Sequence, residues 1–172
     1  AVQVVASLPE DRPILFVPDQ NLDNYVAAQT GRDIVCWEGF CGTHNRLIAE
    51  DILKAKSQHP GALVLVHPEC RPEVVALADT VASTTGMIRF AAGSRARQFI
   101  IATERGILHQ LRKQCPDKEF YLASEELLCP NMKLTTLEKV HRALVSLEPR
   151  VTVPEKTRKR AERCLERMLE VT

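Results

Sequence analysis

The chain has 172 residues, of which 45% are hydrophobic and 26% are charged, a balance typical of a soluble protein with a sizeable core. Its formal net charge of +1 removes bulk electrostatics as an argument for nucleic-acid binding. No apolar run approaches the roughly 20 residues that span a bilayer, and nothing at the N-terminus resembles a signal peptide.

Apolar runs alternate with amphipathic segments along the whole chain. The alternation predicts an α/β protein with small parallel sheets covered by helices. The expected strands cover 13–18, 33–37, 62–67, 98–103 and 119–123, with a short apolar-to-polar transition at 81–86. The expected helices cover 1–9, 21–31, 45–57, 72–79, 87–94, 105–115, 135–147 and 154–171.

The first residues, AVQVVASLP, enter a helical pattern without an initiator methionine, a cap or a lead-in. We therefore expect that coding sequence upstream is absent and that the chain is a fragment. The basic and acidic run at 154–171 is expected to form a surface helix and not a nucleic-acid patch.

The cysteines are scattered without any CxxC pair, on a chain too large to need disulfides for stability, which favours a reducing, cytoplasmic compartment. There, a special cysteine is more often a ligand or nucleophile than half of a disulfide. Three of the six, Cys36, Cys115 and Cys164, are interpreted as small packing residues.

An internal repeat relates residues 14–41 to residues 99–129. Each copy has an apolar strand, a following acidic residue (Asp19 or Glu104), a helix, a second strand, a short loop and a cysteine. The repeat places Cys41 and Cys129 at equivalent positions, which suggests a site on a pseudo-symmetry axis.

Two equivalent thiolates can supply part of an iron–sulfur cluster or of a soft-metal site. Two ligands are too few, and the natural place for a third copy is the missing upstream region. A cluster held by three cysteines would leave one iron without a protein ligand, open to substrate as a Lewis acid.

The stretch LVLVHPECRPEVVALAD, residues 63–79, places His67, Glu69 and Cys70 at the end of an expected strand. Residues two apart on a strand point to the same side, so His67 and Glu69 can enter one cavity as an acid/base pair. We expect an imidazole pKa near neutrality and a carboxyl pKa raised by burial. Because Cys70 has no partner in the repeat, it is expected to pack beneath the pair.

Two other readings remain open for this stretch. One is a zinc-dependent hydrolase that uses His67, Glu69 and Cys70 as ligands, although no further histidine cluster supports it. The other is a non-catalytic α/β domain with buried thiols.

Ser83 and Thr84, in VASTTG, stand at an expected helix start. Hydroxyls and free backbone N–H groups at such a start bind anions well, and the same residues can serve as a plain N-cap.

Four segments together resemble the C-terminal three-fifths of the quinolinate synthase family. They are PDQNLDNYVAAQTGRDIVCWEGFCGTH, VHPECRPEVVALADTVASTTGMI, IATERGILHQL and CPNMKLTTLEKV. The resemblance implies a pseudo-threefold assembly of three-layer αβα sandwich domains, with the first domain largely missing here. It also implies a 4Fe-4S cluster held by one cysteine per domain.

The resemblance implies a transferase and dehydratase-type enzyme of NAD biosynthesis. The family condenses iminoaspartate with dihydroxyacetone phosphate, with loss of phosphate and water, to give quinolinate. It further implies that Cys41 and Cys129 are cluster ligands, with the third cysteine outside this chain. By the same resemblance His67 and Glu69 face the substrate, and Ser83 and Thr84 contact its carboxylate or phosphate.

By the same resemblance, residues 1–42 are the end of the second αβα domain and residues 43–128 form the third. Residues 129–172 are expected to pack on the missing first domain. Without that domain the polypeptide alone is expected to be inactive. The L-aspartate oxidase that supplies iminoaspartate is an expected partner.

Overall fold

The computed structural model describes residues 1–171, and its contacts divide the chain into two compact units. Residues 13–128 form one unit, and residues 1–12 group with the segment from Cys129 onward to form the other. The predicted assignment of 1–42 and 43–128 to two domains of a longer protein stays a prediction.

A four-stranded sheet organises the unit of residues 13–128. Its strands are β3 (Leu63–Val66), β4 (Thr80–Val81), β5 (Gln98–Ala102) and β6 (Glu119–Leu122). The order is β4-β3-β5-β6 and every pair is parallel. Parallel strands buried on both faces are near-continuous apolar runs, which explains why these strands could be found in the sequence.

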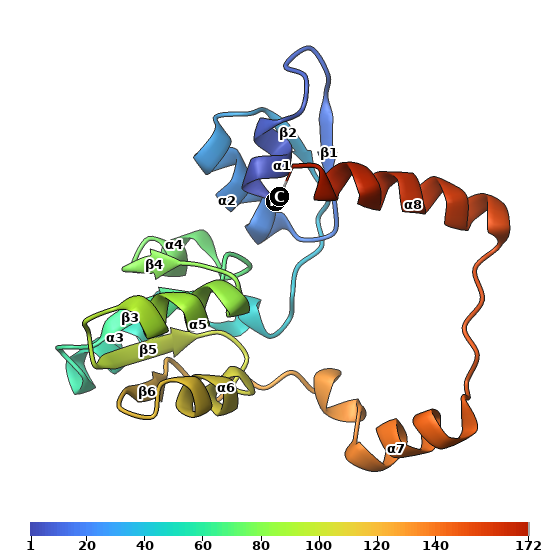
Figure 1. Ribbon diagram of the computed structural model, residues 1–172. Coiled ribbons are helices and arrows are strands. Elements are labelled where there is room, and N and C mark those ends of the chain that lie inside the picture. Colours follow the sequence, from blue (N-terminus) through green and yellow to red (C-terminus); the bar gives the residue numbers. More distant parts are fainter. Residues whose placement is uncertain (172) are drawn as a thin grey trace. The chain divides into compact units, whose positions relative to one another are not determined.

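Helices cover both faces of this sheet, as Figure 1 shows. On one face α3 (Ala49–Gln58) and α4 (Pro72–Val75) pack through Ile52 and Val74. On the other face α5 (Thr84–Gly93) and α6 (Ile107–Gln114) pack through Met87 and Leu111. This part of the chain is therefore a three-layer αβα sandwich.

A smaller parallel pair precedes the sandwich. It consists of β1 (Ile14–Phe16) and β2 (Ile34–Cys36), joined by α2 (Gln20–Thr30). The side chain of Asp19 caps α2, and Gly31 ends it in the left-handed conformation with φ of 67°. The β5–α6–β6 segment has the same parallel strand–helix–strand form, which agrees with the repeat seen in the sequence.

The second unit contains α1 (Val2–Ala6), a short 3₁₀ turn η2 (Met132–Leu134), α7 (Leu137–Ser146) and α8 (Glu155–Leu169). Cys164 is exposed on α8, so the interpretation of this residue as a packing cysteine was wrong. Within residues 1–171, no helix is both long enough and apolar enough to cross a bilayer.

The predicted α/β class with parallel sheets is confirmed, and several helix boundaries differ. The helix predicted from residue 87 begins at Thr84, and the helix predicted over 1–9 ends at Ala6. The segment predicted as one helix from residue 45 is a 3₁₀ turn η1 (His44–Arg46) followed by α3. The helix predicted over 72–79 ends at Val75. Asp79 instead bonds Val64 through both its backbone N–H and its carboxylate, which leads the chain into β4.

Candidate functional site

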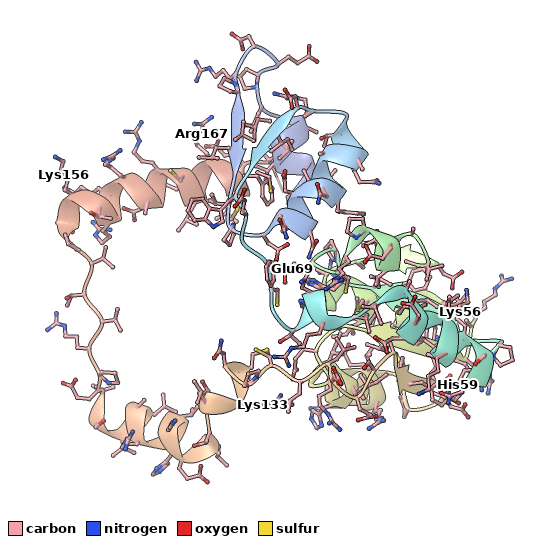
Figure 2. All side chains as sticks on the ribbon, turned by 180° about the vertical axis from the view of Figure 1, so that it is seen from behind. Lys56, His59, Glu69, Lys133, Lys156 and Arg167 are labelled. Carbon is pink, nitrogen blue, oxygen red and sulfur yellow. The ribbon has the colours of Figure 1, made fainter. Side chains whose placement is uncertain are left out.

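The carboxyl ends of the parallel strands bring together most of the residues singled out in the sequence. His67 and Glu69 follow β3, and Ser83 and Thr84 follow β4. Thr103, which the sequence did not single out, follows β5. In open α/β sheets this edge is where ligands bind. Figure 2 shows Glu69 at this end of the sheet and His59 at the opposite end.

Cys41 lies in the loop after β2, and its backbone N–H donates to Asp19 Oδ2 at 2.7 Å. The other carboxylate oxygen of Asp19 accepts from the backbone N–H of Leu22 at 2.8 Å. One buried carboxylate therefore caps α2 and holds the cysteine loop, while the Cys41 side chain keeps partial exposure.

His44 connects this loop to the four-stranded sheet. Its Nδ1 lies 3.2 Å from Cys41 Sγ and 3.0 Å from Glu69 Oε2. Its Nε2 lies 2.8 Å from Thr103 Oγ1, and both side chains are buried. The hydrogen bond from His44 is the main cause that lowers the pKa of Glu69.

His67 stacks on His44 with ring centroids 4.4 Å apart. Its Nδ1 accepts from the backbone N–H of Glu69 at 3.3 Å, so a neutral His67 carries its proton on Nε2. Burial lowers the pKa of His67 to about 4, and His44 acts in the same direction.

The protonation of His67 and Glu69 therefore differs from what the sequence led us to expect. His67 is neutral and Glu69 is ionised at pH 7, because the pKa of the imidazole falls with burial and that of the carboxyl falls through the His44 contact. The carboxylate is set to accept a proton, and the imidazole to donate a hydrogen bond through Nε2.

Two side chains fix the loops that carry these groups. Asn21 Nδ2 donates both to Asn45 Oδ1 and to the backbone carbonyl of Glu69, each at 3.1 Å. Arg71 Nε donates to the backbone carbonyl of Asn45 at 2.7 Å. The loop after β2 and the loop after β3 are thus tied together by direct hydrogen bonds.

Ser83 is the N-cap of α5 and accepts from the backbone N–H of Gly86 at 3.3 Å. Thr84 is the first residue of that helix, and both side chains are exposed. The cap geometry leaves the helix start open to solvent at the same sheet edge as His67. The structure thus gives Ser83 the N-cap role, and anion binding by Ser83 and Thr84 stays a prediction.

The remaining two candidates are Cys129 and Cys70. Cys129 is partly exposed and begins the C-terminal segment of the other unit. Cys70 is completely buried among core residues, with Sγ 3.5 Å from the carbonyl of Ala102. Burial also raises the pKa of Cys70 to about 12. This placement removes Cys70 from the ligand set of the zinc hydrolase alternative and confirms that it packs below the pair.

Sequence reasoning missed His44 and Thr103. The spacing Cys41-x-x-His44 is a common arrangement of metal ligands and could have drawn attention to His44. Thr103 carried no comparable signal, because a threonine at a strand end is ordinary and its contact with His44 joins residues far apart in the sequence.

A family model described as "NadA: Quinolinate synthetase A protein" matches residues 1–170. The chain belongs to the quinolinate synthase family. It is 58% identical over 168 residues to a quinolinate synthase of Desulforudis audaxviator, covering 98% of this chain and 55% of that relative. Against the quinolinate synthase of Methanoregula boonei the identity is 53%, covering 98% of this chain and 56% of that relative. Against that of Geobacter metallireducens it is 52%, covering 99% and 56%.

The chain spans a little over half the length of these quinolinate synthase relatives. The αβα sandwich and the parallel strand pair agree with the architecture that the resemblance implied.

Proposed function

We propose that the protein acts as a quinolinate synthase that condenses iminoaspartate with dihydroxyacetone phosphate to give quinolinate, with loss of phosphate and water. The observation that carries the proposal is the family match over residues 1–170. On this proposal the reaction belongs to NAD biosynthesis in the cytoplasm, and an L-aspartate oxidase that supplies iminoaspartate is the expected partner.

Cys41 and Cys129 are the residues of this chain that would hold a 4Fe-4S cluster, with the third cysteine outside it. Cys41 suits this role because its thiol is partly exposed, in no disulfide, and carried on a loop anchored by Asp19. When bound, such a cluster supplies a Lewis-acidic iron that lacks a protein ligand.

His67 and Glu69 are proposed to handle protons at the substrate. An ionised Glu69 accepts a proton beside an imine or carbonyl carbon, which is the step that a condensation requires. A neutral His67 donates a hydrogen bond through Nε2 and so orients a substrate oxygen or nitrogen. Because Asn21 fixes the backbone of Glu69, the carboxylate starts close to its working position.

Ser83 and Thr84 are proposed to bind the carboxylate or phosphate of a substrate. The start of α5 offers unpaired backbone N–H groups and two exposed hydroxyls, a combination that suits an anion.

The experiment uses the whole protein, purified without oxygen and supplied with iron and sulfide. We expect visible absorbance from the cluster and formation of quinolinate from the two substrates. Cys41→Ala and Cys129→Ala each remove the absorbance, whereas Glu69→Gln keeps the absorbance and lowers kcat by at least about a hundredfold.

His109→Ala, on the exposed side of α6, is the matched control and keeps both properties. A protein that binds no iron and makes no quinolinate would support the reading as a non-catalytic domain. Unchanged absorbance in both cysteine variants would contradict the proposed ligands.

A further inference from the structure

The side chains of Cys41, His44 and Glu69 form a compact group of mixed chemistry. Their ligand atoms, a sulfur, an imidazole nitrogen and a carboxylate oxygen, all lie within 4.8 Å of one another. Only Cys41 among them belongs to the proposed cluster site. His44 and Glu69 therefore complete, with the Cys41 sulfur, a second ligand set that could bind a single metal ion.

We propose that Cys41 Sγ, His44 Nδ1 and Glu69 Oε2 bind a single divalent ion of the Zn²⁺ class when the iron–sulfur cluster is absent. The three ligands themselves do not depend on the proposed activity, because all lie within residues 13–128, whereas the competition with a cluster rests on the proposed function. The ion and the cluster compete for the same thiolate, so the two states exclude each other.

The spacing of the three atoms supports such an ion. Zn²⁺ binds sulfur at about 2.3 Å and nitrogen or oxygen at about 2.0 Å, so tetrahedral geometry separates its ligands by about 3.3 to 3.5 Å. The observed separations are 3.2 Å from His44 to Cys41 and 3.0 Å from His44 to Glu69. For these two pairs a movement of a few tenths of an ångström reaches this geometry, and Cys41 Sγ and Glu69 Oε2 lie within 4.8 Å of each other.

The surroundings of His44 also suit a ligand. A histidine that binds a metal through one nitrogen commonly uses its other N–H in a hydrogen bond that fixes the ring. Thr103 Oγ1 lies 2.8 Å from Nε2 and is almost completely buried. A hydroxyl both donates and accepts, so Thr103 accommodates the transfer of the ring proton from Nδ1 to Nε2 that metal binding at Nδ1 requires.

A three-residue zinc site needs a fourth ligand from solvent or substrate, and two of the three side chains are accessible to one. Glu69 retains 28% of its side-chain exposure and Cys41 is partly exposed, while His44 and Thr103 form the buried side. Solvent therefore reaches the two partly exposed ligands, and a water or a substrate carboxylate would complete the coordination.

The test uses the whole protein stripped of metal without oxygen and titrated with Co²⁺, which reports thiolate ligands by a charge-transfer band. We expect one equivalent of Co²⁺ with such a band and displacement of Co²⁺ by Zn²⁺. Cys41→Ala removes the band, and His44→Ala weakens Co²⁺ binding by more than about a hundredfold, since even indirect partners are worth 10- to 100-fold.

Further variants separate ligation from folding. Glu69→Gln changes a partly exposed side chain of equal size and should weaken binding without disturbing the fold, as circular dichroism can verify. Thr103→Val should weaken binding by about 10- to 100-fold, with recovery in Thr103→Ser. His109→Ala and Cys164→Ala alter exposed residues and serve as controls that keep the band.

Cys129→Ala distinguishes this site from the proposed cluster. It should lose the cluster that forms with excess iron and sulfide and keep the cobalt–thiolate band. If the band is absent from the parent protein, or survives both His44→Ala and Glu69→Gln, the inference is wrong. A parent protein that shows the band but assembles no cluster would contradict the proposed function alone.

Discussion

The four-stranded sheet and the β1–β2 pair are built from the same parallel strand–helix–strand unit and differ in their covering. In the sheet, Ile100 of β5 is completely buried between helices on both faces. In the pair, Leu15 and Val35 oppose each other and remain 67% and 61% exposed. The two regions thus share their strand–helix–strand connection, and they differ in how many of their strand side chains are shielded from solvent.

The candidate site joins these two regions. Cys41 comes from the loop after β2, whereas Glu69 and Thr103 follow strands of the four-stranded sheet. The contacts of His44 therefore join a well-covered scaffold to a strand pair with one bare face. Variants in the four-stranded sheet and in the β1–β2 pair therefore show how much each region contributes to the stability of the protein.

The largest difference is expected between matched truncations of the two sheets. Ile100→Ala removes a completely buried side chain and should lower the free energy of unfolding by about 2 to 5 kcal/mol. Leu15→Ala, at an exposed position, should change it by about 0.5 kcal/mol or less. Urea unfolding of both variants checks the prediction, and equal losses would show that the bare face contributes as much as the core.

The next effect concerns the caps of the two regions. Asp19→Ala removes a cap and also leaves the backbone N–H of Cys41 without its acceptor, at a cost of about 2 to 3 kcal/mol. Ser83→Ala removes only the exposed cap of α5, at about 1 kcal/mol. Thermal unfolding of both variants ranks them, and the reverse order would contradict a structural role of Asp19 at the cysteine loop.

A smaller effect is expected in thiol reactivity, which reports how well the core shields a cysteine from solvent. Burial raises the pKa of Cys70 to about 12, so its thiol stays protonated and inaccessible at pH 8. Iodoacetamide should modify exposed Cys164 and leave Cys70 unmodified until urea unfolds the protein, as peptide mass spectrometry can show.

The raised pKa of Cys70 also makes the stability of the folded protein depend on pH. A raised pKa in the folded protein stabilises it fully below about pH 8.5, the ordinary value for cysteine, and this contribution is lost as the pH rises toward 12. Cys70→Ala should flatten the loss of stability at alkaline pH. A slope equal to that of the parent would contradict the assignment to Cys70.

The smallest effect lies at the exposed amino end of the sheet. The hydrogen bond from Tyr121 lowers the pKa of Glu119, and Gln98 acts in the same direction. This contribution is present above the ordinary carboxyl pKa and is lost as the pH falls through the lowered value. In an NMR titration Tyr121→Phe should move the pKa of Glu119 upward, with only a slight change in stability because the groups are exposed.

Much of this architecture could be predicted from the sequence because buried parallel strands are apolar runs, whereas the strand order β4-β3-β5-β6 was not predicted. The extent of the helix after Pro72 could not be predicted either, since its end depends on the bond of Asp79 to Val64. The candidate site could likewise be predicted only in part. Cys41, His67 and Glu69 stood in recognisable motifs, whereas the Thr103 contact and the protonation of the pair depend on burial by distant segments.

Asn21 has a consequence for the dynamics of the molecule. Its single amide group, at the start of α2, holds both the Asn45 side chain and the Glu69 carbonyl. We therefore expect fraying of the first turn of α2 to weaken both contacts together, while the bond from Arg71 to Asn45 still joins the loops. A helix that contributes no proposed ligand or proton carrier therefore couples the two loops that carry the site.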